Sequence, residues 1–157
     1  ISPNLRFPKA KKFSSGYKTT KKRTVVKADI NIATASDLES IYGIGGVLSN
    51  RIIKFRNALG GFITVDQLYD VYGLEEEVVK NVVERYKIVD IPEIERISIN
   101  ESTVPELASL VYLSWDVARE IVAYRNSIGA YSQWEDLAQV SGFPFDKIER
   151  IKLYLTL

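Results

Sequence analysis

Ile41-Tyr42-Gly43-Ile44-Gly45-Gly46 is the stretch that decides the fold, and the residues after it, Val47 to Ile53, have the composition of a helix. The pattern places a glycine-containing turn directly before a helix start. Glycine accepts positive φ and has no side chain to block a ligand. Backbone N–H groups and the positive helix end can converge there on one anion. The stretch predicts a phosphate site and makes nucleic acid the first partner to consider.

The same pattern returns further along the chain. Gly142 follows Gly73 by 69 positions, and the pairs Leu38 with Leu107 and Gly60 with Gly129 show the same offset. Identical pairs at this offset also include Ile30 with Ile99, Asn31 with Asn100, Thr34 with Thr103, Ser40 with Ser109, Arg56 with Arg125, Asn57 with Asn126 and Val71 with Val140. One shared offset over so many positions indicates an internal duplication. It predicts an arm or linker at residues 1–28, a first unit at 29–90 and a second, degenerate unit at 91–157.

Each unit resembles the helix-hairpin-helix motif, and the first unit is most similar to ComEA-type competence proteins. The matching residues are Ile30-Asn31-Ile32-Ala33-Thr34-Ala35, Phe55-Arg56, Gly60-Gly61-Phe62, Leu68 and Val71-Tyr72-Gly73-Leu74. The resemblance implies an all-α fold of two tandem units, each with two hairpins and four to five short helices. It also implies non-catalytic binding of double-stranded DNA. It allows a monovalent cation held by backbone carbonyls at the first hairpin, and no other cofactor is expected.

Composition excludes several classes of function. The chain has no cysteine and no histidine, so disulfides, thiolate nucleophiles, imidazole bases and ordinary zinc sites are ruled out. No carboxylate pair shows the spacing of a catalytic cleft, so we expect neither an enzyme nor a small-molecule substrate. No apolar run approaches the roughly 20 residues that span a bilayer. We expect a cell-envelope location if a longer protein carries an anchor and a cytoplasmic one otherwise.

Charge is distributed very unevenly. Residues 1–28 carry nine basic residues and no acid, whereas the remaining 12 basic residues face all 20 acids, which leaves −8 in the repeats. The arm includes Lys18, Lys21, Lys22, Arg23 and Lys27. It has three interpretations: it tracks a phosphate backbone while Phe7, Phe13 and Tyr17 stack on bases, it is a solvated linker, or it lies beside anionic lipids. An acidic body is itself a poor general DNA binder.

Two features of residues 1–8 predict that further chain precedes them. The chain opens with Ile1 rather than methionine, which predicts that it is a piece of a longer protein. Phe7-Pro8 is similar to Ile91-Pro92, so residues 1–8 are expected to be the tail of an earlier repeat.

Capping residues and apolar spacing predict the helices. The predicted starts are Thr34 with Asp37, Thr103 with Glu106, Thr64 with Gln67, and Ser132 with Glu135. A long second helix in each unit should end at a glycine, Gly60 or Gly129. A final helix is expected from about Glu75 to Tyr86 and again from about Phe145 to Leu155.

The four hairpins differ in how well their residues could bind a phosphate. Glu75, Glu76 and Glu77 come after the second hairpin and place negative charge where a phosphate would lie. The third, Leu110 to Asp116, replaces both glycines, and the fourth has Pro144, which lacks an N–H, at a donor position. These three hairpins are therefore expected to be structural.

The first hairpin is the candidate site. Its predicted phosphate-binding residues are Gly43, Ile44, Gly45, Gly46, Asn50, Arg51 and Lys54. All of these except Asn50 also have a structural interpretation: the glycines make a tight turn, Ile44 is a buried apolar anchor, and Arg51 and Lys54 form a solvated face. Backbone contacts carry no base information, so any DNA binding should be sequence-independent.

Two hypotheses remain open. One is a non-catalytic DNA-binding module, and the other is an interaction or scaffold module whose hairpins have lost DNA binding. Trp115 and Trp134 stand where the first unit has Gly46 and Val65. Trp115 is either a core residue or a contact for a protein partner of the second unit, or for the first unit itself.

Overall fold

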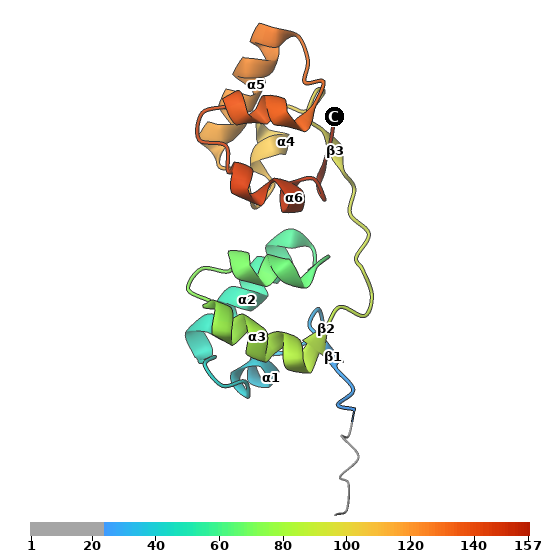
Figure 1. Cartoon of the computed structure of the whole chain (residues 1–157), viewed down its shortest axis with the longest axis vertical. Helices are drawn as coiled ribbons and strands as arrows, with labels where there is room; N and C mark the ends of the chain where they lie inside the picture. Colours follow the sequence, from blue (N-terminus) through green and yellow to red (C-terminus); the bar gives the residue numbers. More distant parts are fainter. Residues whose placement is uncertain (1–23) are drawn as a thin grey trace, which may run out of the picture.

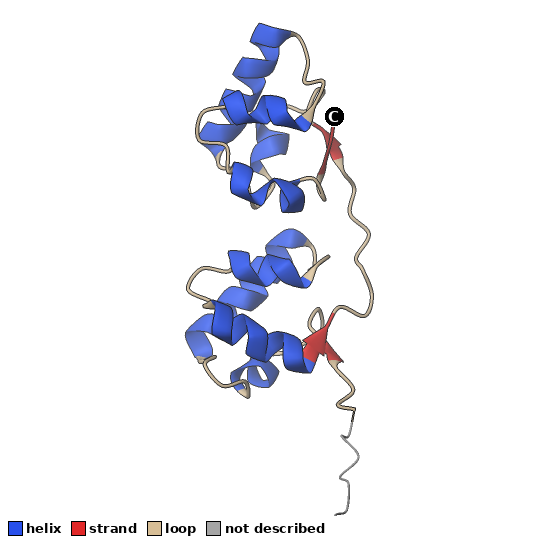
Figure 2. Cartoon of the chain, in the orientation of Figure 1, coloured by secondary structure: helices blue, strands red, loops and turns tan. Residues whose placement is uncertain are grey.

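The computed structural model describes residues 24–157. Within that range the protein is mainly α-helical and forms two similar units joined by an extended segment (Figures 1 and 2). This confirms the predicted all-α class and tandem helix-hairpin-helix architecture. Lys18, Lys21, Lys22 and Arg23 of the basic arm lie outside the described residues, as do the predicted repeat tail at 1–8 and the aromatic side chains of the arm.

The first unit runs from β1 to β2. Its elements are β1 (Ala28–Asp29), α1 (Ala35–Glu39), α2 (Gly46–Leu59), the 3-10 helix η1 (Val65–Asp70), α3 (Glu76–Arg85) and β2 (Tyr86–Lys87). The second unit repeats this order as β3 (Ile97–Ser98), α4 (Val104–Ala108), α5 (Trp115–Ile128), η2 (Trp134–Gln139), η3 (Phe145–Lys147), α6 (Ile148–Ile151) and β4 (Leu155–Thr156). The internal duplication read from the sequence is therefore a duplication of structure.

The first helix of each unit begins at the predicted capping box. The Asp37 N–H donates to Thr34 Oγ1 over 3.2 Å, and the Thr34 N–H donates to an Asp37 carboxylate oxygen over 2.8 Å. Thr103 and Glu106 repeat both contacts at 3.4 and 2.7 Å. These bonds satisfy donors at the helix start. The Thr34 hydroxyl and N–H both donate to the Asp37 carboxylate, and Thr103 donates to Glu106 in the same way. These bonds stabilise the carboxylate form and lower the pKa values of Asp37 and Glu106.

Two predictions about the later helices were wrong in detail. The third element of each unit is a 3-10 helix, and in the second unit it is capped by Gln133 with Asp136 rather than by Ser132 with Glu135. The predicted final helix to Leu155 is instead the three-residue η3 and then the four-residue α6. Hydrogen bonds to the third residue back shorten the α-helical part: the Lys147 N–H donates to the Pro144 carbonyl before α6, and the N–H groups of Leu153 and Tyr154 donate to the Arg150 and Ile151 carbonyls after it.

Short strands close each unit. β1 pairs in parallel with β2, and β3 pairs in parallel with β4, so the first residues of each unit are bonded to its last. A half-buried side chain ties α2 to the residues after β1: Arg56 Nη1 donates to the carbonyls of Ile30 and Ala33 at 2.9 and 2.7 Å. Desolvation by burial lowers the pKa of Arg56. Arg125 makes the same two bonds in the second unit, each 2.8 Å long.

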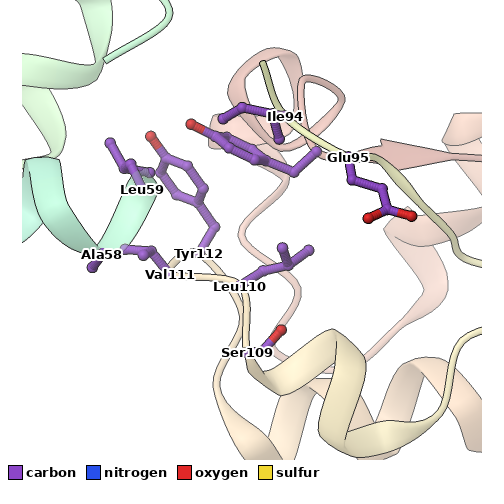
Figure 3. Close-up of a pocket in the computed structure, with 9 residues that line it drawn as sticks. Ala58, Leu59, Ile94, Glu95, Ser109, Leu110, Val111 and Tyr112 are labelled. Carbon is purple, nitrogen blue, oxygen red and sulfur yellow. The ribbon is translucent and has the colours of Figure 1, made fainter. Parts of the chain in front are cut away.

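A mixed apolar and polar interface joins the two units. Tyr112 of the second unit packs edge-on against Phe55 of α2, with ring centroids 6.2 Å apart, and lies 6.1 Å from the ring of Tyr154. Figure 3 shows Tyr112 reaching towards Leu59 at the edge of a cavity of about 140 Å³ between the units. Burial raises the pKa of the Tyr112 hydroxyl. The second unit therefore uses a hairpin residue to contact the first.

Polar groups inside this interface are paired with one another. The Tyr112 hydroxyl donates to Asp70 Oδ2 over 2.9 Å, and Arg150 Nη2 donates to Asp70 Oδ1 over 2.8 Å. The Asp70 side chain is only 3% exposed. Gln67, which is fully buried, donates to the Tyr154 hydroxyl over 2.6 Å. Because buried charges are tolerated only when paired, this network fixes how the units meet.

Candidate nucleic-acid interface

The tight turn of the first hairpin requires glycine at only one of its three glycine positions. Gly43 has φ +94°, and a Cβ there would lie 2.8 Å from Val78 Cγ2. Gly45 has φ −103°, and a Cβ there would meet nothing within 4 Å. A Cβ on Gly46 would make only an ordinary 3.7 Å contact with Glu39 Oε1. Neither turn geometry nor packing explains why positions 45 and 46 are glycine.

These two glycines leave backbone donors uncovered at the start of α2. Within residues 24–157, the N–H groups of Gly45, Gly46 and Val47 donate no hydrogen bond. Both glycines are exposed. Glycine at the first position of a helix costs stability relative to alanine, since it loses more conformational freedom on folding. The N-terminus of this 14-residue helix is thus open to an incoming anion.

The second hairpin is related to the first by a pseudo-two-fold arrangement within the unit. Gly73 has φ +79° and faces Leu48, as Gly43 faces Val78. The two hairpins also brace each other: Arg51 Nη1 donates to the Tyr72 carbonyl, and Asn81 Nδ2 donates to the Tyr42 carbonyl, both over 3.2 Å.

Arg51 therefore lies at the second hairpin, rather than at the first as its sequence position predicted. Its guanidinium carbon is 4.8 Å from the centre of the Tyr72 ring. Asn50 and Lys54 are exposed on α2. Ile44 is 6% exposed and belongs to the core, so it is the buried anchor of the turn.

Acidic side chains surround the open helix start. Glu39 accepts a hydrogen bond from the buried Ser49 hydroxyl over 3.0 Å, which holds its carboxylate beside Gly46. Glu75, Glu76 and Glu77 are exposed at the second hairpin. The contact with Lys80 lowers the pKa of Glu76, which keeps that group ionised. A phosphate at the first hairpin would therefore have carboxylates on neighbouring turns.

Sequence reasoning missed three contributors to this surface. Tyr42 and Tyr72, at equivalent positions in the two hairpins, are 90% and 81% exposed. Their repetition 30 residues apart, each before a glycine, was a signal visible in the sequence. The sequence gives no signal that Glu39 lies beside α2. Its contact with Ser49 depends on how α1 and α2 cross.

The third and fourth hairpins carry side chains where the first has glycine backbone. In the third, the Ser114 hydroxyl accepts the Val117 N–H over 3.2 Å, and Tyr112 occupies the place of Gly43. In the fourth, Pro144 occupies the N-cap position of a three-residue 3-10 helix.

One residue of the predicted basic arm belongs to the folded region. Lys27 Nζ donates to the Val83 carbonyl near the end of α3. Lys27 is therefore held against the first unit.

Two absences can be stated for the part of the chain that the structure describes. Residues 24–157 contain no group of three or more metal-binding side chains. In the same range, none of the helices has the length and apolar character needed to cross a bilayer.

The fold and the open helix start define a small, all-α module that presents backbone donors on glycine hairpins. A family model described as the helix-hairpin-helix motif matches residues 24–85 and again residues 92–156. These segments make up more than half of the chain, and the protein belongs to the helix-hairpin-helix family.

Individual relatives cover the chain to different extents. Endonuclease/exonuclease/phosphatase family domain-containing protein 1 of Homo sapiens is 47% identical over 58 residues, which cover 37% of this chain and 10% of that protein. The Mus musculus protein of that name is 24% identical over an alignment of 180 residues, covering 97% of this chain and 31% of that protein. A Danio rerio protein named transcription elongation factor, mitochondrial, is 37% identical over 71 residues, covering 45% of this chain and 19% of that protein.

The chain thus spans about a third or less of the length of these relatives. No solved structure gives a significant match to the chain.

Proposed function

We propose that the protein binds DNA without catalysis, through a backbone phosphate held at the first hairpin. The observation that carries the proposal is the pair Gly45 and Gly46, which neither φ nor packing requires and which expose N–H groups at the start of α2. Helix-hairpin-helix motifs commonly bind DNA, and such a helix start favours a phosphate. Asn50 and Lys54, exposed on the same helix, would approach the neighbouring backbone.

The proposed binding is independent of sequence and directed at double-stranded DNA. Backbone N–H groups contact phosphate and read no base. The arm at residues 1–28, with nine basic residues, would add affinity that falls steeply with salt and would offset the acidic repeats. The division into an arm, a first unit at 29–90 and a second at 91–157 is part of this proposal.

Two finer points stay predictions. The resemblance of the first unit to ComEA-type proteins favours a role in DNA uptake. The same resemblance allows a monovalent cation at the first hairpin, although the carbonyls of Ile41 and Tyr42 each already accept one hydrogen bond.

A matched pair of substitutions tests the phosphate site. Gly45→Asp places a carboxylate among the open N–H groups at a position whose φ and surroundings accept a side chain. Aspartate is also a favourable N-cap residue, so the fold should be kept. Ser114→Asp makes a similar change at the equivalent N-cap of the second unit, which is the control.

The measurement is fluorescence anisotropy of a labelled DNA duplex titrated with the full chain at low salt. We expect Gly45→Asp to weaken binding about tenfold, the size of one lost charge-assisted hydrogen bond, and Ser114→Asp to change it little. Equal affinities for the two folded variants would overturn the proposal. A chain shortened to residues 24–157 keeps Lys27 and removes the other eight basic residues of the arm. Binding that disappears in this chain belongs to the removed part of the arm.

A further inference from the structure

The second unit has diverged from the first at two equivalent positions. Trp115 and Phe145 replace Gly46 and Glu76 at the same 69-residue offset. Each begins a helix: Trp115 is the first residue of α5, and Phe145 is the first residue of η3. The surface that presents backbone donors or carboxylates in the first unit therefore presents aromatic rings in the second.

These two helix starts lie at the same end of the second unit. Gly142, three residues before Phe145, faces the first turn of α5, since a Cβ on it would lie 3.6 Å from Val117 Cγ2. Trp115 is 52% exposed and Phe145 is 39% exposed. We call these two residues the aromatic face.

Acidic residues border the aromatic face. Asp116 and Asp146 come directly after its two rings and are exposed. Of the basic residues near it, Arg119 pairs with Asp116, and Lys147 is turned to Asp70 at the interface between the units. An apolar centre with an acidic rim suits a protein ligand with lysine or arginine beside apolar side chains, and it repels phosphate.

We propose that the aromatic face docks a basic, amphipathic segment of a partner protein. Trp115 and Phe145 would cover the apolar side chains of that segment, as buried aromatic anchors do in other interfaces. Asp146 would pair with a cation of that segment. This function is separate from DNA binding at the first hairpin. It uses the second unit, and its ligand is basic whereas DNA is anionic.

The test uses Trp115 as its own reporter. In the full chain carrying Trp134→Phe, Trp115 is the only tryptophan. The probe is a short peptide with leucine and lysine at helical spacing. We expect a blue shift of Trp115 emission on titration, and no shift with the same peptide carrying glutamate for lysine.

Two variants locate the binding. Phe145→Gln should weaken peptide binding roughly fivefold or more, the usual effect of losing one anchor. Ile128→Gln alters a residue with similar exposure, 42%, at the far end of α5 and should leave binding unchanged.

Three results would overturn this proposal. They are the absence of a shift with the leucine-lysine peptide, an equal shift with the glutamate peptide, and a shift produced only by oligothymidylate, which would make the face a stacking surface for bases. Gly45→Asp should not affect the peptide titration, so failure of one proposal is distinguishable from failure of the other.

Discussion

The first and third hairpins occupy equivalent places 69 residues apart but use them differently. In the first, Gly43 allows a close approach to α3, and Gly45 and Gly46 leave the start of α2 open. In the third, Tyr112 turns into the contact with the first unit, and Ser114 caps its own helix. The comparison shows that a duplicated hairpin can become a structural joint once its glycines are replaced.

The two glycine roles in the first hairpin can be separated by alanine. Gly43→Ala forces a side chain into φ +94° and against Val78, so we expect it to destabilise the fold by about 2–3 kcal/mol. Gly46→Ala meets no close atom and should be neutral or stabilising by about 0.5 kcal/mol. Urea denaturation monitored by circular dichroism measures both. Similar losses would contradict the assignment of a structural role to Gly43 alone.

The joint made by the third hairpin depends on Asp70. Asp70→Asn leaves the half-buried Arg150 guanidinium without its carboxylate and should destabilise the protein by about 2 kcal/mol. Asp116→Asn, which alters an exposed carboxylate paired with Arg119, is the control and should change stability by less than about 0.5 kcal/mol. If both variants melt alike in scanning calorimetry, the network does not hold the units together.

The second hairpin can be given the residues of the first. The triple variant E75G/E76G/E77V makes positions 75–77 identical to positions 45–47. Removing three negative charges and opening a second set of donors should raise duplex affinity about tenfold at low salt. The variant E101Q/E135Q/E149Q removes three charges from the second unit and controls for net charge. An equal gain in that control would show that only net charge matters.

Acid should weaken both units through their capping boxes. Asp37 and Glu106 have pKa values below their ordinary ones, so the unfolded chain binds more protons in mildly acidic solution. The stability that they contribute is present above about pH 4 and is lost as the pH falls further. Thermal unfolding between neutral pH and pH 3 should show this loss.

Replacing both capping carboxylates should flatten that pH dependence. In the double variant D37N/E106Q, neither side chain titrates in the acid range. The exposed Glu101→Gln serves as the control, because Glu101 caps no helix. An unchanged slope in the double variant would assign the acid sensitivity to other carboxylates.

The sequence by itself determined the class of fold, the duplication and the first helix of each unit. Capping boxes, glycine stops and apolar spacing are local signals, and each acts within a few residues of its own position. The sequence did not predict the 3-10 geometry of η1 and η2. It also did not predict the shortened helix at the end of the second unit. Local patterns distinguish a 3-10 helix poorly from an α-helix, and a proline shifts a helix boundary without specifying the type or length of the next element.

Only the tertiary structure decided which residues of the candidate site face one another. Arg51 lies at the second hairpin, Glu39 beside the first, and Tyr112 in the joint between units. These contacts link residues 10 to 42 positions apart, and their formation depends on how helices cross. The sequence could show that Gly45 and Gly46 are glycine. The fold was needed to show that nothing in the turn requires them to be, because φ and the space around a missing Cβ exist only once the chain is packed.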